Sequence, residues 1–260
     1  MTAKIVAVAN QKGGVGKTTS TLNIARALHE KGQHVLAIDC DPQSSLSIVC
    51  GVDDRRLRDL ERSGRTLYHG LVKSIPLSEL IISGEPDVIP ASIRLANAEQ
   101  ELNSPFGSAT ILREKMIPLR ELYDVILIDC PPTLSLLTVN ALTAADYVII
   151  PVKTDFLSIM GVPLLLETIE NVRNRANHRL TLIGILPTMF FTTANHDTAL
   201  LAELRELSTQ QNITVFDPVS RATAFDKANA SGKSALELFP ATKGVDQYRL
   251  IADKIISYEQ

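Results

Sequence analysis

The ten residues from Asn10 to Thr19, NQKGGVGKTT, constrain the fold of this chain more than any other stretch. They follow an apolar, β-branched run at residues 4–9 and precede a pattern in which Leu22, Ala25 and Leu28 recur at helical spacing. The sequence therefore predicts a strand, a glycine-rich loop and a helix, in that order.

This loop has the composition of a phosphate-binding loop, or P-loop, in an altered form. The pattern G-x-x-x-x-G-K-[ST] has Gln11 at its first glycine position. Glycines let backbone N–H groups surround a polyphosphate, and the positive end of the following helix adds to the attraction. We expect nucleotide contacts from Lys12, Gly13, Gly14, Val15, Gly16, Lys17, Thr18 and Thr19. The Lys17 ammonium would reach the β- and γ-phosphates and the Thr18 hydroxyl would bind Mg²⁺, whereas the alternative is a glycine-rich turn with two solvated lysines.

Lys12 is a second lysine at the mouth of the same loop. Two ammonium groups this close repel each other unless a strong anion lies between them. The position of Lys12 suggests that its side chain points outward, towards a neighbouring molecule.

Three aspartates follow two further apolar runs. Residues 34–38 (HVLAI) precede Asp39 and Asp41, and residues 124–128 (DVILI) precede Asp129. Short apolar runs of this kind are typical of strands buried on both faces of a parallel sheet, whose carboxyl ends meet at one edge. We therefore expect all three aspartates beside the phosphates, with Asp39 and Asp129 near Mg²⁺. The alternative for Asp39 and Asp41 is helix capping before a proline turn.

The rest of the chain alternates strands and helices. Further strands are expected at residues 147–151, 180–186 and 213–216, and further helices at about 135–145, 157–176, 196–209 and 244–258. Residues 53–121 have weaker periodicity and are expected to form short helices. The alternation predicts an α/β fold with a single doubly wound, mainly parallel sheet and helices on both faces. No repeat or long linker divides residues 1–260, so we expect one domain.

Composition limits the class of protein. The chain has 260 residues, of which 45% are hydrophobic and only 5% aromatic, as suits an aliphatic α/β core. Its three cysteines (Cys40, Cys50, Cys130) lack C-x-x-C spacing, so we expect free buried thiols in a reducing cytoplasm. We find no signal-peptide pattern and no apolar run of about 18 residues, and therefore expect a soluble, unexported protein. The net charge of −3 means that any surface for nucleic acid must be local.

The base of the nucleotide can also be inferred. A guanine site usually needs an [NT]-K-x-D motif, and the nearest match, residues 152–155 (VKTD), has valine at the first position. Adenine is therefore favoured.

Together these segments resemble the ParA/MinD family of deviant-Walker ATPases, and the ParA branch most closely. The resemblance rests on residues 12–19, residues 39–43 (DCDPQ), residues 88–92 (VIPAS) with Leu95, Ala96, Glu99 and Leu102, and residues 127–132 (LIDCPP). It covers essentially the whole chain. It implies a P-loop fold and Mg²⁺-dependent hydrolysis of ATP.

The resemblance implies roles for individual residues. Lys12 is similar to the family's signature lysine, which reaches the phosphates of ATP in the partner subunit of a dimer. Lys17 and Thr18 resemble the ordinary P-loop lysine and the Mg²⁺ ligand. Asp41 matches the switch I aspartate that positions the attacking water, and Asp129 the Walker B residue near Mg²⁺. Lys12, Lys17 and Asp41 would then carry catalysis.

The adenine-binding side is less distinct in the sequence. In members of the family the base lies near segments that correspond here to Thr188, Met189 and the region around Pro218. Packing of Met189 in a loop and a turn at Pro218 are equally good interpretations.

The resemblance also implies partners. ParA-like proteins form homodimers on binding ATP, bind double-stranded DNA without sequence preference, and have a ParB-like or other adaptor that stimulates hydrolysis. We expect Arg221, Lys227 and Lys233 to contact DNA, and a solvated surface is the alternative for each. The protein would be cytoplasmic and associated with the nucleoid.

Alternatives remain open. MinD-like members end in a basic amphipathic helix that lies on membranes, whereas residues 246–260 carry two bases against three acids, which favours a packed helix and no membrane contact. A nucleotide-bound scaffold without turnover is a second alternative, and an iron–sulfur reductase, for which Cys130 is poorly placed, is a third. The chain starts one strand before the loop, so we do not expect the N-terminal helix-turn-helix of larger plasmid relatives.

Overall fold

Six parallel strands form one sheet in the order β3-β2-β4-β1-β5-β6, within residues 2–102, 108–191 and 195–258, which a computed structural model of the chain describes. The strands are β1 (Lys4–Val8), β2 (Val35–Asp39), β3 (Asp87–Ile89), β4 (Val125–Asp129), β5 (Tyr147–Lys153) and β6 (Thr181–Thr188). The strand order reverses at β1, which lies between β4 and β5. The predicted doubly wound sheet is therefore confirmed.

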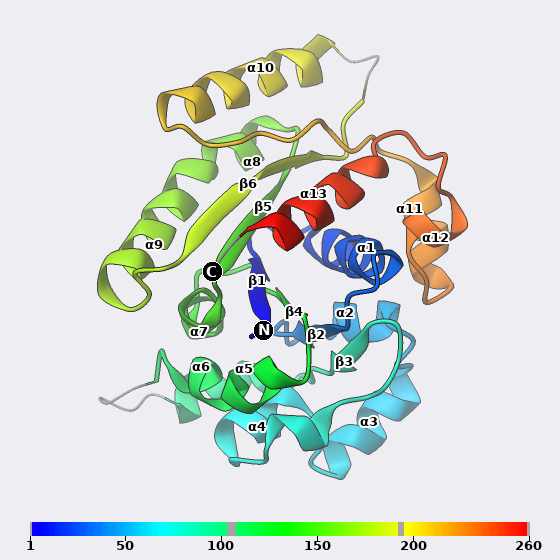
Figure 1. The fold of residues 1–260 in the computed structure, drawn as a ribbon, viewed down its shortest axis with the longest axis vertical. Coiled ribbons are helices and arrows are strands. Elements are labelled where there is room, and N and C mark those ends of the chain that lie inside the picture. Colours follow the sequence, from blue (N-terminus) through cyan, green and yellow to red (C-terminus); the bar gives the residue numbers. More distant parts are fainter. Residues whose placement is uncertain (1, 103–107, 192–194, 259–260) are drawn as a thin grey trace.

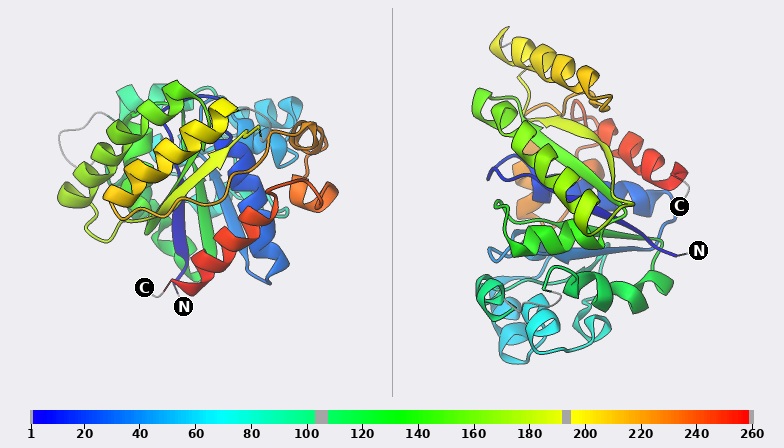
Figure 2. Two further views of the ribbon diagram at one scale, coloured as in Figure 1. Left: turned by 90° about the horizontal axis from the view of Figure 1, so that it is seen from above. Right: turned by 90° about the vertical axis from the view of Figure 1, so that its left-hand side faces the viewer.

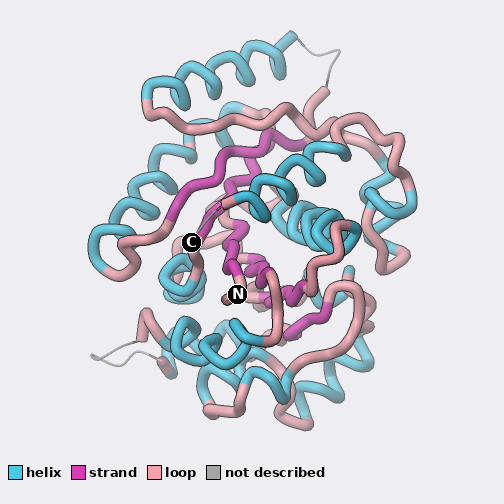
Figure 3. Tube along the Cα trace, viewed as in Figure 1, coloured by secondary structure: helices cyan, strands magenta, loops and turns pink. Residues whose placement is uncertain are grey.

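Helices cover both faces of this sheet (Figure 1). Figure 3 shows the strands as an inner layer with helices around it. The α-helices are α1 (Lys17–Glu30), α2 (Ser45–Val49), α3 (Asp54–Arg62), α4 (Leu67–Val72), α5 (Leu95–Glu101), α6 (Ile111–Met116), α7 (Leu136–Ala144), α8 (Phe156–Met160), α9 (Val162–Arg175), α10 (Asn195–Gln210), α11 (Thr223–Ala230), α12 (Ala235–Leu238) and α13 (Asp246–Ser257). Two 3-10 helices, η1 (Leu77–Leu80) and η2 (Ile117–Glu121), complete the set in the described part of the chain.

The core has two main parts, one on each face of the sheet. Side chains of a strand alternate between faces, so Ile5 and Ala7 pack with helices α4 to α10, whereas Val6 packs with α1 and α11 to α13. Figure 2 shows these layers from two further directions, with α10 outermost, beyond β6. The cysteines are free as expected, and Cys40 and Cys130 are buried, but Cys50 is only partly buried.

The structure differs from the sequence prediction in several elements, including the short helices α2 and α12, which were not expected. Residues 53–121 contain the short strand β3 between their helices, where we expected helices alone. The predicted helix over residues 157–176 is divided into α8 and α9 at Gly161. The predicted strand at residues 213–216 forms only an isolated bridge, between Val215 and Ile185, with hydrogen bonds from Ile185 N to Thr214 O and from Phe216 N to Ile185 O.

The last helix, α13, is a packed helix, as its composition indicated. Tyr248, Ile251 and Ile255 are fully buried against α1 and its neighbours. These three residues therefore belong to the core. None of the helices formed by the described residues is long and apolar enough to span a bilayer.

The parallel arrangement brings distant segments to one edge of the sheet. Val8 at the end of β1 is paired in register with Asp129 of β4, and Asp129 is paired in turn with Asp39 of β2. The loop that follows β1 therefore begins beside two of the three predicted carboxylates.

Candidate functional site

The glycine-rich loop is held in a fixed conformation by backbone and side-chain contacts. Gly14 and Gly16 have φ of 69° and 83°, values that side chains disfavour, so glycine is required at these two turns. Asn10 anchors the start of the loop, because its amide Nδ2 donates to Pro151 O at 2.7 Å and its Oδ1 accepts from Lys12 N at 3.0 Å. This role of Asn10 was not expected from the sequence.

Lys17 lies inside the loop at the first position of α1. Its side chain is 7% exposed, and its ammonium donates to Lys12 O at 3.1 Å. Burial lowers the pKa of Lys17, while the charge of Asp129 works in the opposite direction. A buried ammonium at a helix N-terminus is placed to attract phosphate oxygens.

The two principal candidates for metal ligation lie side by side. Thr18 Oγ1 donates to Asp129 Oδ2 at 2.7 Å, and Thr21 Oγ1 donates to Asp129 Oδ1 at 3.3 Å. Burial, followed by the charge of Asp39, raises the pKa of Asp129 to about 8. The described residues hold no cluster of three or more His, Cys, Asp or Glu suited to a metal ion. A hydroxyl and a carboxylate fit Mg²⁺, which is bound by few protein oxygens together with water and phosphates.

Asp39 lies at this edge but is turned into the protein. Its side chain is fully buried; Oδ2 accepts from Ser47 N at 2.8 Å and from Ser47 Oγ at 2.7 Å, and Oδ1 accepts from Asp41 N at 3.1 Å. Burial raises its pKa to about 6. These bonds tie the end of β2 to the loop after it and give Asp39 an anchoring role, while its contact with Mg²⁺ stays a prediction.

Asp41 is partly exposed on that loop. Its Oδ1 accepts from Gln43 N at 2.9 Å. It lines a hollow of about 290 Å³ together with Pro131 and Pro132, which follow β4. The carboxylate therefore lies between the loops that follow the two aspartate-bearing strands, and it can reach a water molecule there.

Lys12 is paired within its own chain. Its ammonium lies 2.6 Å from Asp155 Oδ1, and Lys153 lies 3.1 Å from Asp155 Oδ2. The expected outward orientation towards a neighbour is therefore not the one in this structure, because Asp155, 143 residues further along the chain, supplies the anion that balances the second lysine. Asp155 also caps α8 by accepting from Ser158 N at 2.8 Å.

A cavity of about 230 Å³ opens beside the loop and is the candidate base pocket. Gly16, Thr19, Thr188 and Met189 line it, as the resemblance implied for the last two. Pro218 does not line it; the next residues along the chain do, together with Lys153, Phe225, Asp226 and Tyr248. Thr188 connects the cavity wall to the glycine-rich loop, since its hydroxyl donates to Val15 O at 2.8 Å.

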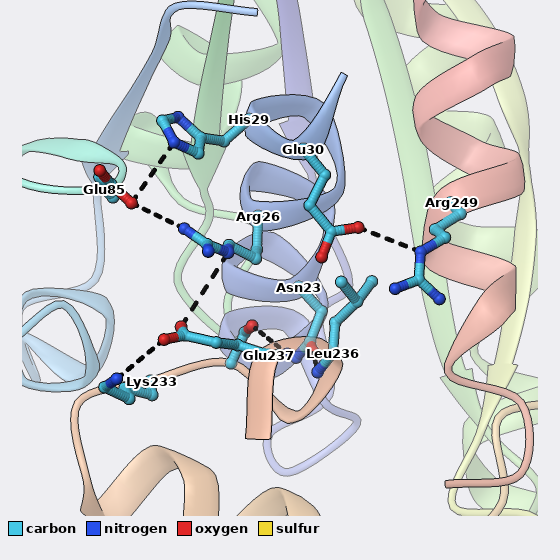
Figure 4. A network of polar contacts seen from close by, with 10 residues as sticks. Asn23, Arg26, His29, Glu30, Glu85, Lys233, Leu236, Glu237 and Arg249 are labelled. Atoms are coloured by element: carbon cyan, nitrogen blue, oxygen red, sulfur yellow. Dashed lines mark hydrogen bonds and ion pairs between the residues drawn. The ribbon is translucent and has the colours of Figure 1, made fainter. Parts of the chain in front are cut away.

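The three predicted DNA contacts lie in different surroundings. Arg221 lines the base pocket, with its guanidinium 5.3 Å from the centre of the Phe191 ring. Lys227 is exposed on α11. Lys233 pairs with Glu237 at 2.8 Å, and Glu237 also faces Arg26 of α1 (Figure 4). All three residues are exposed, and of the three only Lys233 has an ion pair among the described residues.

This combination of a glycine-rich loop, a buried lysine at a helix N-terminus and a Thr18–Asp129 pair defines a P-loop nucleotide-binding site. Residues 3–182 match the family model described as an AAA domain. The chain belongs to the ParA/MinD family of P-loop ATPases, as the sequence predicted. It is 34% identical to the sporulation initiation inhibitor protein Soj of Bacillus subtilis, over 97% of this chain and 98% of that protein.

Further comparisons agree. The chromosome partitioning protein ParA of Caulobacter vibrioides is 35% identical over 99% of this chain and 95% of that protein. Among solved structures, cobyrinic acid a,c-diamide synthase from Mycobacterium smegmatis with bound ADP and magnesium superimposes with a TM-score of 0.80 at 33% identity. That alignment covers 96% of this chain and 93% of the other.

Proposed function

We propose that this protein is a partition or positioning ATPase of the ParA type, with ATP and Mg²⁺ as its ligands. The observation that carries the proposal is the geometry of Lys17 and Thr18–Asp129 at the mouth of the glycine-rich loop. Two relatives that cover almost the whole chain, from Caulobacter vibrioides and Thermus thermophilus, are named as chromosome-partitioning proteins, and the diamide synthase structure contains ADP and magnesium.

The residues of this chain suit in-line attack of water on the γ-phosphate. Lys17 binds phosphate oxygens, and Asp41, on its exposed loop, orients the attacking water. Thr18 and Asp129 would hold Mg²⁺, which neutralises charge on the transferring group. Catalysis is then mostly positioning and charge neutralisation, and turnover is slow until an adaptor protein stimulates it.

Lys12 couples this chemistry to dimerisation in the proposal. A lysine at the loop mouth, held by a carboxylate that is itself about one-third exposed, can exchange that carboxylate for the phosphates of a second protomer. ATP binding would favour this exchange because the γ-phosphate adds negative charge. The protein would therefore be monomeric with ADP and dimeric with ATP.

The ParA branch, with duplex DNA as the surface it binds, is favoured over the membrane branch by α13. Its residues Tyr248, Ile251 and Ile255 are part of the core, so they are not free to enter a bilayer, and only Leu250 and Ile256 among its large apolar residues are exposed. In the dimer the weak phosphate contacts of two protomers add on one duplex, so that binding depends on ATP. The cargo would be a plasmid, a chromosomal region or a protein assembly, and the protein would be associated with the nucleoid.

Two variants test the switch. Lys12→Ala should bind ATP yet fail to dimerise in sedimentation velocity with ATP, and Asp41→Ala should dimerise with ATP and release phosphate at least tenfold more slowly. Dimerisation of Lys12→Ala with unchanged affinity would show that the lysine does not act in trans. Unchanged phosphate release by Asp41→Ala would remove that residue from the mechanism.

A binding assay tests the DNA part of the proposal. Fluorescence anisotropy with a random duplex should show binding with ATP, little with ADP, and a steep loss of affinity as salt rises. Equal affinity with both nucleotides, or tight binding to anionic vesicles without DNA binding, would contradict it.

A further inference from the structure

Helix α3 carries a row of arginines on the face opposite its buried side. Leu60 is buried and Leu57 partly buried against Val52 and Val88, and this small cluster fixes how the helix lies. At 100° per residue, Arg55, Arg58 and Arg62 fall within an arc of roughly 60° on the opposite face. All three side chains are exposed.

The guanidinium groups of this row make few contacts, although Asp54 and Asp59 lie on the same helix. The side chains of Arg55 and Arg58 have no hydrogen bond or ion pair in the part of the chain that the structure describes, and Arg62 is 3.9 Å from Asp59, with both side chains largely exposed. Two nearby acids are engaged elsewhere: Asp53 caps α3 by accepting from Arg56 N, and Glu61 pairs with Arg94 at 2.8 Å. Asp54 and Asp59 lie four residues from Arg58 and Arg55, respectively, but neither of these two pairs is within ion-pair distance in the part of the chain that the structure describes.

The turn before α3 lies against the turn that follows α11. Gly232 lies against the turn before α3, because a Cβ placed on it would be 3.6 Å from Gly51 Cα. Lys227 and Lys233 lie on either side of Gly232 in the chain. Figure 1 shows α3 at the lower right and the α11–α12 segment above it.

We propose that the outward face of α3, formed by Arg55, Arg58 and Arg62, contacts the phosphate backbone of double-stranded DNA as an extension of the surface at the end of α11. This inference rests on the proposed function and adds a DNA-contacting element to it. The row spans roughly 10 Å along the helix. That length matches about three phosphates of one strand, which are spaced roughly 3.4 Å apart along the axis of the duplex. Phosphate contacts carry no sequence information, in keeping with nonspecific binding.

The test is a triple variant, Arg55→Gln with Arg58→Gln and Arg62→Gln, because glutamine keeps the helix propensity of arginine. The matched control is Arg113→Gln with Arg175→Gln and Arg179→Gln, which removes the same charge near the end of α9. Both proteins and the parent are titrated with a random duplex in ATP at several salt concentrations. Nucleotide-dependent dimerisation and the thermal midpoint are measured in parallel.

The triple variant should lose affinity about tenfold or more, and its log–log salt slope should fall by about 0.9 for each lost phosphate contact, whereas the control stays near the parent. If the triple variant dimerises poorly, the single variant Arg58→Gln decides through its slope, which should fall by about 0.9. Parent-like affinity and slope in the α3 variants would overturn the inference and leave the proposed function intact. Absence of ATP-dependent duplex binding by the parent would overturn both. If the α3 variants keep duplex binding but lose binding to anionic vesicles, the face contacts a membrane and the inference is overturned.

Discussion

The two sides of the nucleotide site are built in different ways. On the phosphate side, Lys17 and Asp129 are almost fully buried and bonded to the loop and to α1. On the base side, the cavity wall is formed by irregular segments after β6 and before α11, and includes Met189 at a φ of 54°. A rigid phosphate side supplies charge at fixed positions, whereas an irregular base side supplies a shape that loops can alter.

The difference predicts how each side responds to substitution. Loss of a buried charge on the phosphate side removes an interaction that nothing else in the pocket can replace. Loss of one contact on the base side changes a wall that has several other members. Substitutions on the phosphate side should therefore have larger effects than substitutions on the base side. The opposite order would contradict this comparison.

The largest effect is expected from Lys17→Met, which keeps most of the length of the side chain and removes its charge. A hydrogen bond to a charged group contributes about 1.5–3 kcal/mol, so ATP affinity should fall by roughly ten- to 100-fold in calorimetric titration. Lys31→Met is the control, since Lys31 pairs with Asp253 away from the site. Parent-like ATP affinity in Lys17→Met would mean that the buried ammonium does not bind phosphate.

A smaller effect is expected where the two sides meet. Thr188→Val removes the hydroxyl that donates to Val15 O and leaves that carbonyl without its partner. The free energy of unfolding should fall by about 1–2 kcal/mol, and the affinities for ATP and ADP should fall by a similar few-fold factor, because the contact does not involve the γ-phosphate. Denaturant unfolding and calorimetry measure the two quantities. A loss confined to ATP would place Thr188 on the phosphate side.

The same division explains how far the sequence could predict the site. Lys17 and Thr18 lie in one local motif, which the sequence shows directly. Asp129 ends β4, which is paired with β1, so the rule that the carboxyl ends of parallel strands meet was sufficient to place Asp129 beside that motif. The orientation of Asp39 depends on Ser47, and the pairing of Lys12 depends on Asp155, and no local pattern contains either partner.

The fold shows the same limit. The alternation of apolar runs was enough to predict the sheet and its helices, but β3 has only three residues and lies among short helices, so its periodicity is too brief to detect. Residues 213–216 have a strand-like pattern, yet Lys254 donates to Ile183 O and so covers part of the free edge of β6. Among the described residues, a single bridge, between Ile185 and Val215, forms beside it. Both differences depend on tertiary contacts.

The smallest effect is expected at the mouth of the loop, where Asp155 faces Lys12 and Lys153. Asparagine caps helices as well as aspartate does, so Asp155→Asn keeps the cap on α8 and removes only the charge. Burial alone would raise the pKa of Asp155, but the hydrogen bonds from Lys12, Ser158 and Lys153 outweigh it and hold the pKa well below 3.8.

A carboxyl group whose pKa is lower in the folded state stabilises the protein above its unfolded pKa, and this contribution is lost as pH falls through the folded value. At pH 7 the parent should be more stable than Asp155→Asn by about 0.2–1 kcal/mol, the range for partly exposed ion pairs. The difference should shrink progressively as pH falls below 3.8, and it should also shrink in high salt, which screens the pair. Thermal unfolding of both proteins at pH 7, 5 and 3 measures it; a difference that stays constant across this range would mean that the cap, and not the ion pair with Lys12, is what Asp155 contributes.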